Sequence, residues 1–326
     1  MKEIIVASYF DGIACAKQVF NILGVPVKYY YAWEICPHAI KIAMKNHPMI
    51  IQRGTVVNAI LDDLPKIDFF VGGSPCTGFS RAGLMLNFED KQSKLFFEYV
   101  RALNYFKSKN PDLKFLLENV NMKQEWQDII SDLVGVKPIR INSKLLSAQT
   151  RDRLYWTNIE GVEVPEDKGI ELCTIIESGA VDRDKSYCLD ANYFKGTNAK
   201  QYICKSRRQV VWVIPEATKK GYVKVTEGQC IDLTFIKSKT RRGRLMLKKS
   251  NCLTATPGVL CKVTNDWFRM LTPVEMERLQ TLPDNYTEGV SISQRKKIIG
   301  NAWTVDVIAH ILKGAFPMKQ SVKENE

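Results

Sequence analysis

The chain has 326 residues, of which 45% are hydrophobic and 25% are charged, and its formal net charge is +12 at pH 7. This length can bury a full hydrophobic core and favours two domains. No apolar run approaches the roughly 20 residues that a membrane-spanning helix requires, and the opening residues MKEIIVASYFDG lack the basic and apolar regions of a signal peptide. We therefore expect a cytoplasmic protein with no membrane partner.

Cysteine and histidine are distributed in a way that argues against a metal site. The nine cysteines include no CxxC pair, and three histidines occur. Neither a zinc site nor a His-based catalytic triad is therefore expected. An odd number of cysteines without a secretion signal fits reduced thiols in the cytosol.

The first 150 residues alternate strand and helix patterns. Strands are expected at 4–10, 27–35, 68–73 and 114–120, and helices at 11–23, 37–47, 94–106 and 125–134. This order is typical of an α/β fold with a doubly wound, mostly parallel sheet and helices on both faces. Residues 138–147 and 153–159 are expected to form paired strands beyond the main sheet.

Two features at the ends of the first two strands indicate an adenosyl-type ligand. Gly12 lies in the first strand-to-helix turn, where it permits close approach of a nucleotide. Glu34 ends the second strand, where a carboxylate can bind ribose hydroxyls. The glycine pattern is partial, since Ala14 stands where a second glycine is common.

The third strand leads into the sequence DFFVGGSPCTGFS. Pro75 stiffens the loop on which Cys76 leaves the sheet. Loops beyond the carboxyl ends of strands hold the chemistry of open α/β sheets, although a buried and inert thiol is the commoner role of a lone cysteine.

Polar residues also follow the next strands. Glu118 ends the fourth strand, so it should lie on the same rim as Cys76. The sequence QTRDR places Gln149, Arg151 and Arg153 at alternate positions, on one face of an extended segment. Ordinary surface ion pairs are the alternative role for these arginines.

From about residue 161 to 264 the regular pattern is lost. Strand-like stretches at 209–215 and 221–226 lie among turns, so we expect a smaller, irregular, mostly β domain. Residues 195–249 contain 15 Lys and Arg but three Asp and Glu, which leaves the rest of the chain neutral overall. Interspersed aromatic residues favour a nucleic-acid surface over a solvated lysine-rich face.

The helical pattern returns at 271–283, with Thr272 as N-cap and Pro273 in the first turn. A longer helical segment at 295–316 follows it. We therefore assign residues 1–160 and 265–326 to a catalytic domain and residues 161–264 to a basic recognition domain.

Five ordered sequences, GGSPCTGFS, ENV, QTRDR, LTATPG and GNAWTV, resemble the motifs of the C5-cytosine DNA methyltransferases. The resemblance covers nearly all of residues 4–160 and 250–315, and the basic segment lies where that family keeps its target-recognition domain. FDGIA, WEIC, GGSPC, LFFEY and GNAWTV are most similar to the catalytic domain of the animal de novo DNA methyltransferases. The resemblance implies a Rossmann-like methyltransferase fold.

The resemblance also implies an activity. The chain is expected to transfer a methyl group from S-adenosylmethionine to carbon 5 of a flipped-out cytosine in double-stranded DNA. Cys76 would add to carbon 6, and Glu118 would hydrogen-bond N3 and the exocyclic amine and donate a proton to N3. Arg153 would hold O2, and Arg151 would support the nucleophile loop.

Further contacts are carried over by position. The expected cofactor contacts are Phe10, Asp11, Gly12, Ile13, Glu34, Ile35, Thr55, Val56, Gly73, Pro75, Leu95, Asn301 and Trp303. The expected DNA contacts are Arg81, Gln149, Arg207, Arg208, Arg241, Arg242 and Arg244.

One position departs from the family pattern. The family usually has an aspartate that accepts a hydrogen bond from adenine N6, whereas this chain has Thr55. A hydroxyl accepts more weakly than a carboxylate, and Asn58 is an alternative acceptor.

Other functions stay open at this point. One branch of the family modifies transfer RNA with the same motifs, and an inactive DNA-binding member or a dinucleotide oxidoreductase would share parts of the pattern. We expect a monomer, which a cognate restriction enzyme could accompany.

Overall fold

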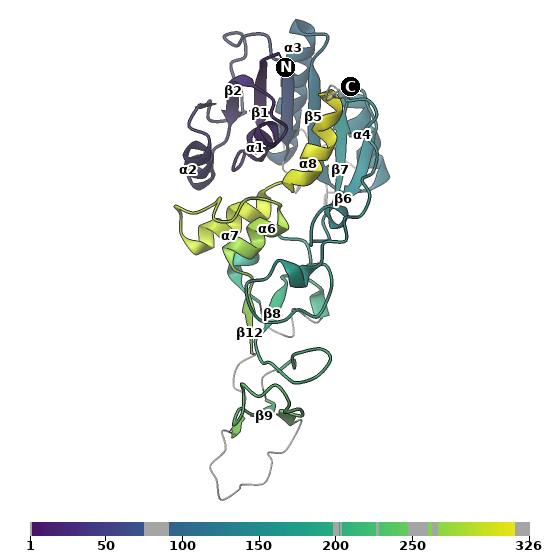
Figure 1. Cartoon of the computed structure of the whole chain (residues 1–326). Coiled ribbons are helices and arrows are strands. Elements are labelled where there is room, and N and C mark those ends of the chain that lie inside the picture. The colour runs from purple at the N-terminus through teal and green to yellow at the C-terminus, as the bar shows by residue number, and fades with distance from the viewer. Residues whose placement is uncertain are drawn as a thin grey trace, which may run out of the picture.

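The computed structural model describes residues 2–74, 91–197, 202, 204–225, 228–246, 260–262 and 267–316, without the side chains of 91–93 and 260–262. Within these residues, no helix is both long enough and apolar enough to cross a membrane. The molecule is elongated, with a large sheet and its helices at one end and small β elements at the other (Figure 1).

The large sheet has seven strands in the order β3-β2-β1-β4-β5-β7-β6. The strands are β1 (Ile4–Tyr9), β2 (Val27–Trp33), β3 (Ile50–Gln52), β4 (Phe69–Gly73), β5 (Lys114–Val120), β6 (Pro138–Asn142) and β7 (Asp152–Thr157). β7 runs antiparallel to both of its neighbours, and the other adjacent pairs are parallel. The expected doubly wound, mostly parallel sheet is therefore confirmed.

Two details of the sheet differ from the expectation. β6 and β7 pair with each other, but they extend the main sheet, because β7 hydrogen-bonds to β5 along its length. The alternating side chains of β7 explain this place: Tyr155 packs into the core on one face and Leu154 and Trp156 into the core on the other. β3, three residues long at the sheet edge, was not expected from the sequence.

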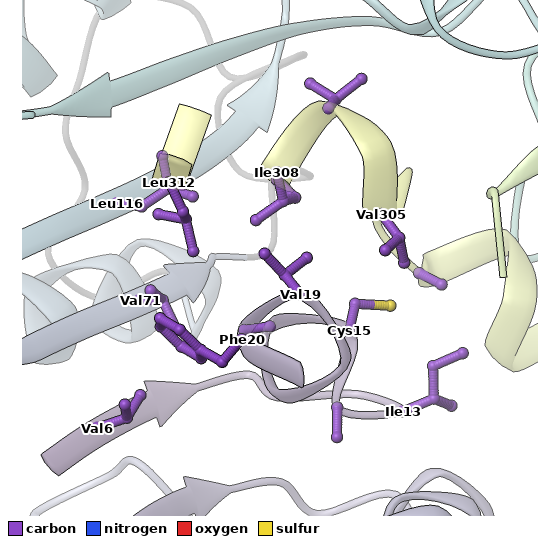
Figure 2. Close-up of a cluster of buried hydrophobic side chains, with 14 of the residues drawn as sticks. Val6, Ile13, Cys15, Val19, Phe20, Val71, Leu116, Val305, Ile308 and Leu312 are labelled. Carbon is purple, nitrogen blue, oxygen red and sulfur yellow. The ribbon is translucent and has the colours of Figure 1, made fainter. Parts of the chain in front are cut away.

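Helices cover both faces of the sheet. On one face lie α1 (Cys15–Ile22), α2 (Pro37–Asn46) and α8 (Val305–Leu312), and on the other α3 (Lys91–Lys109) and α4 (Gln124–Val134). Figure 2 shows Val19 of α1 pointing toward Ile308 of α8, with Phe20 beside Val71 of β4. The strand order reverses between β1 and β4, and the crevice beyond the carboxyl ends of such strands is where open α/β sheets bind ligands.

The C-terminal helical segment is broken where the sequence pattern is continuous. α6 (Pro273–Leu279) begins with a capping box in which Thr272 and Glu275 bond each other's backbone N–H, as its N-cap predicted. The single helical segment expected at 295–316 is instead α7 (Ile292–Asn301) and α8, with Ala302 extended at φ −68° and ψ 159° between them. The carbonyl of Ala302 accepts from the Arg151 guanidinium at 3.0 Å instead of continuing the helix.

The strands in and next to residues 161–264, called the basic region below, are short. β8 (Val210–Trp212) pairs with β12 (Phe268–Met270), and β9 (Cys230–Asp232) pairs with β10 (Leu245–Met246) and β11 (Leu260–Lys262). Short 3-10 helices lie at Ser143–Leu145, Leu172–Thr174, Tyr193–Lys195 and Lys313–Ala315. Residues 221–225 form a single bridge between Tyr222 and Pro215 rather than the expected strand. The division into domains stays a prediction, and the β8–β12 pair crosses its proposed boundary at 264.

One segment of this region packs against the sheet-bearing part of the chain. Ser186 exchanges backbone hydrogen bonds with Ala148 and Thr150 at 2.7 and 2.8 Å. Farther along, a Cβ at Gly300 of α7 would lie 2.2 Å from the carbonyl oxygen of Asp190. The absence of a side chain at Gly300 therefore lets the segment 186–193 lie directly on α7.

The turn after β1 holds a buried carboxylate. Phe10, Gly12 and Ala14 all have positive φ, at 56°, 60° and 62°, so Ala14 adopts the conformation that favours a glycine. The Asp11 side chain points into the core, where its Oδ1 accepts from the Tyr30 hydroxyl at 2.6 Å. Burial raises the pKa of Asp11 to about 6, although the Tyr30 and Ser8 hydrogen bonds oppose the shift.

This pKa predicts a pH dependence of folding stability. Between about pH 4 and pH 6 the folded chain holds the Asp11 proton and the unfolded chain does not. The free energy of unfolding should therefore fall by about 1–3 kcal/mol as the pH rises through this range, relative to Asp11→Asn. Urea unfolding of both proteins at a series of pH values measures the difference.

The exposed Asp112 supplies the control. Asp112→Asn should follow the wild-type profile. A constant difference between wild type and Asp11→Asn from pH 4 to pH 7 would contradict the raised pKa.

Candidate active site

A cavity of about 510 Å³ opens beyond the carboxyl ends of β1, β2, β4 and β5. Twelve of the residues singled out in the sequence line it: Phe10, Gly12, Glu34, Ile35, Thr55, Val56, Gly73, Leu95, Glu118, Arg151, Arg153 and Asn301. Those that follow β1, β2, β4 and β5 meet because parallel strands end at the same edge of a sheet, and the antiparallel strand β7 begins at that edge, where Arg153 lies.

Other expected residues have different places. Asp11 and Ile13 are buried beneath the turn after β1 and do not line the cavity. Trp303 is absent from the cavity wall but contacts it through Glu118. Pro75, Cys76 and Arg81 lie outside the described residues.

Glu34 is fixed by backbone groups at the mouth of the first turn. Its Oε2 accepts from the N–H of Gly12 at 2.8 Å, and its Oε1 accepts from the N–H groups of Ile35 and Cys36 at 2.9 and 2.8 Å. Three charge-assisted hydrogen bonds hold the carboxylate in one orientation on the cavity wall. Its remaining lone pairs can accept from the hydroxyls of a ribose.

The position of the missing family aspartate is also on the wall. Thr55 lines the cavity, and its hydroxyl oxygen accepts from the N–H of Val57 at 3.2 Å. This hydroxyl keeps a proton to donate and a further lone pair. Asn58, the alternative acceptor, is not among the residues that line the cavity.

Glu118 and Arg153 form an ion pair across neighbouring strands. The Arg153 Nε lies 2.9 Å from the Glu118 Oε1, and both side chains are largely buried. The indole N–H of Trp303 donates to the Glu118 Oε2 at 3.1 Å. Burial opposes the charged form of Arg153, but Glu118, Cys188 and Tyr155 together outweigh it and raise the pKa of the guanidinium.

Gly73 makes room for this arrangement. It pairs with Glu118 across β4 and β5. A Cβ at this position would lie 2.9 Å from the Trp303 Nε1 and 3.1 Å from the Glu118 Oε2. A side chain here would displace the hydrogen bond that orients the carboxylate.

Arg151 is buried and bonds to backbone rather than to a carboxylate. It donates to the carbonyls of Leu189 and Ala302 at 3.0 Å and of Gly300 at 3.4 Å. Burial and the neighbouring Arg153 lower its pKa. Arg151 thus joins β7 to α7 and to the segment 186–193, and its expected role toward the nucleophile loop involves residues outside those described.

Thirteen residues of the wall were not singled out in the sequence: Trp33, Cys36, Ala39, Gly54, Ser74, Asn119, Val120, Cys188, Leu189, Asp190, Ala191, Ile298 and Gly300. Most are chain neighbours of expected residues. Residues 188–191 are different, because they come from the region assigned to DNA recognition and carry no motif. The Cys188 sulfur lies 3.7 Å from Arg151 Nη1 and 3.8 Å from Arg153 Nη2.

Two expected DNA contacts are corrected by the structure. Gln149 is 0% exposed, and its amide donates to the Leu279 carbonyl and the Gln280 side chain at 2.7 and 2.8 Å. Arg244 is 1% exposed and donates to the Ser238 carbonyl at 3.0 Å. Both side chains are buried within the protein, so neither is exposed to DNA in this structure.

The other arginines of the basic region differ in exposure. Arg207 and Arg242 are exposed, although the Arg242 Nε donates to the Ala217 carbonyl at 2.7 Å. Arg208 is half-buried and donates to the Gly196 carbonyl at 2.6 Å, and Arg241 pairs with Asp232 at 2.7 Å. Arg207 and Arg242 are therefore better placed than Arg208 and Arg241 to contact phosphate groups.

No group of three or more His, Cys, Asp or Glu side chains suited to a metal ion occurs within the described part of the chain.

Comparisons with known proteins agree with this architecture. A family model described as C-5 cytosine-specific DNA methylase matches residues 4–316. The chain is 25% identical over 315 residues to the type II methyltransferase M.FnuDI of Fusobacterium nucleatum, which covers 86% of each chain. The Dnmt2 methyltransferase of S. pombe is 15% identical, has a TM-score of 0.57 and matches 96% of this chain and 100% of its own, which supports the fold.

A phage relative is more similar over a shorter stretch. The orphan methyltransferase M.Rho11sI of Bacillus phage rho11s is 31% identical over 183 residues, which is 52% of this chain. The match spans 36% of that relative's length. The particular similarity to the animal de novo DNA methyltransferases stays a prediction. Because the family model matches residues 4–316, the chain belongs to the C-5 cytosine-specific DNA methylase family.

Proposed function

We propose that this chain is a DNA (cytosine-5)-methyltransferase that uses S-adenosylmethionine and acts on double-stranded DNA. The observation that carries the proposal is the buried pair of Glu118 and Arg153 on the wall of a cavity that also contains Glu34. Family membership and the basic region at the far end of the molecule support it.

The cavity suits an adenosyl group. Glu34 presents fixed carboxylate oxygens at the end of β2, and Gly12 leaves the turn after β1 open to close approach. Thr55, Val56 and Leu95 would surround the adenine, and Phe10 and Asn301 would lie along the rest of the ligand. When bound, S-adenosylmethionine supplies an electrophilic methyl group on its sulfonium sulfur.

The ion pair matches the edge of cytosine. The exocyclic amine, N3 and O2 lie in a row on that edge. A carboxyl and a guanidinium held side by side offer an acceptor for the amine and donors for O2. Glu118 would therefore bind the amine and N3, and Arg153 would bind O2.

Cys76 would make carbon 5 nucleophilic. Its thiolate would form a bond to carbon 6 while Glu118 delivers a proton to N3, which converts the ring to an enamine-like species. After carbon 5 has received the methyl group, loss of the carbon-5 proton to water would restore the 5,6 double bond and expel the Cys76 thiolate, and N3 would return its proton to Glu118. The cytosine would have to leave the duplex first, because the reacting atoms are otherwise stacked. The motif GGSPCTGFS supports this role of Cys76.

Replacement of Glu118 tests the proposed acid. Glu118→Gln retains the shape of the side chain but removes the transferable proton, so the methylation rate should fall by about 10²–10⁴-fold. Transfer of a labelled methyl group to duplex DNA measures the rate, and transfer RNA serves as the parallel substrate for the alternative function. Binding of the duplex should persist.

The exposed Glu125 of α4 gives a matched control. Glu125→Gln should methylate DNA at the wild-type rate. Near-full activity of Glu118→Gln would remove the acid role, and wild-type methylation of transfer RNA but not of DNA would favour the RNA enzyme.

The basic region predicts a salt-dependent DNA affinity. Replacing the exposed Arg207 and Arg242 with Gln should weaken duplex binding and lower the slope of log K against log salt by roughly one unit per lost phosphate contact. Arg101→Gln, an exposed change on α3, should leave the slope unchanged. An unchanged slope in the double variant would mean that the charge of this region is only a solvated face.

A further inference from the structure

Three carboxylates line the cavity among the described residues: Glu34, Glu118 and Asp190. Two of them are committed to other partners. Glu34 accepts three backbone N–H groups and is placed for a ribose, and Glu118 is paired with Arg153 and Trp303. Asp190 is the third.

Asp190 has a carboxylate oxygen with no partner among the described residues. Its Oδ1 accepts from the N–H of Asn192 at 2.7 Å, which closes a tight turn. Its Oδ2 has no hydrogen-bond partner within the part of the chain that the structure describes. The side chain is half-buried on the cavity wall, so this oxygen is available to a ligand.

The backbone around Asp190 is held firmly. Its own carbonyl lies against the bare Cα of Gly300, and the preceding carbonyl, of Leu189, accepts from Arg151 at 3.0 Å. Leu189 and Tyr193 on either side are buried in a core cluster with Ile299 of α7. The carboxylate is therefore presented to the cavity from a fixed position.

The positive charge of the proposed ligand requires a carboxylate such as that of Asp190 on the cavity wall. S-adenosylmethionine carries a sulfonium and an α-ammonium against one carboxylate, a net charge of +1. The two cations on the wall, Arg151 and Arg153, would repel the ammonium, and a cation taken out of water needs a paired acceptor.

The expected positions of the ribose and of the methyl group determine where the ammonium lies in the cavity. With the ribose at Glu34 and the methyl group directed at a base on Glu118 and Arg153, the amino-acid arm faces the remaining wall. That wall contains Asp190, Gly300 and Asn301. We propose that Asp190 binds the α-ammonium of the methyl donor and of its product, an inference that rests on the proposed function.

A ligand pair isolates this contact. S-adenosylhomocysteine keeps the α-ammonium but has no methyl group to transfer, and its deamino analogue has hydrogen in place of the ammonium. Calorimetry of both ligands with wild type and with Asp190→Asn completes a double-mutant cycle. The Asn variant keeps an acceptor for the Asn192 N–H, so the turn should remain intact.

Wild type should bind S-adenosylhomocysteine about tenfold more tightly than the deamino analogue. Asp190→Asn should bind the two ligands equally, and Asp190→Ser, which also keeps an acceptor for the turn, should do the same. Asp184→Asn, an exposed change six residues before Asp190, should discriminate as wild type does.

Two outcomes would overturn the inference while the proposed function stands: wild type that binds S-adenosylhomocysteine but does not discriminate, or variants of Asp190 that discriminate as wild type does. Wild type that binds neither ligand would instead contradict the proposed function itself.

Discussion

The buried guanidinium of Arg151 is the constraint on which the site depends. A charge removed from water must be satisfied by hydrogen bonds, and here the carbonyls of Leu189, Gly300 and Ala302 supply them. Each carbonyl belongs to a different local structure: the segment 186–193, the end of α7 and the break before α8. One side chain on the sheet thereby fixes three parts of the chain that are remote in sequence.

The break in the helix at Ala302 also affects the ion pair of Glu118 and Arg153. Because the chain leaves its helix at Ala302, Trp303 can turn its indole toward the sheet and donate to Glu118. Gly73 leaves the space that this contact needs. The carboxylate is then held between Trp303 and Arg153, and little reorganisation is left for the moment of reaction. Gly300 and Asn301, at the end of α7, line the cavity together with Asp190.

The sequence predicted which residues come together at the ends of the parallel strands. β5 spans the expected residues, and Gly12, Glu34 and Glu118 meet at one rim because parallel strands share a carboxyl edge. The alternation of Gln149, Arg151 and Arg153 was also informative, but the shared face points inward, so Gln149 became a buried hydrogen-bonding residue rather than a DNA contact. Exposure depends on what packs above a strand, which the pattern does not contain.

The features that could not be predicted from the sequence depend on contacts between residues far apart in the chain. Nothing in the residues 302–304 forbids a helix, and at the break the Ala302 carbonyl accepts from both the Arg151 guanidinium and the Gln280 amide at 3.0 Å. Residues 188–191 lie in an irregular, mostly β region, and their place on the cavity wall depends on the contact between Asp190 and Gly300. No local periodicity encodes such a contact.

The proposed reaction at this cavity begins with addition of Cys76 to cytosine. Duplex DNA with fluorine at carbon 5 of the target cytosine tests it most directly, since the fluorine cannot leave as a proton does and the adduct cannot resolve. In the presence of S-adenosylmethionine, the wild-type chain should form a denaturation-resistant complex, and mass spectrometry should locate the modified base on Cys76. A complex that still forms with Cys76→Ala, or an adduct that maps to another residue, would show that Cys76 is not the nucleophile.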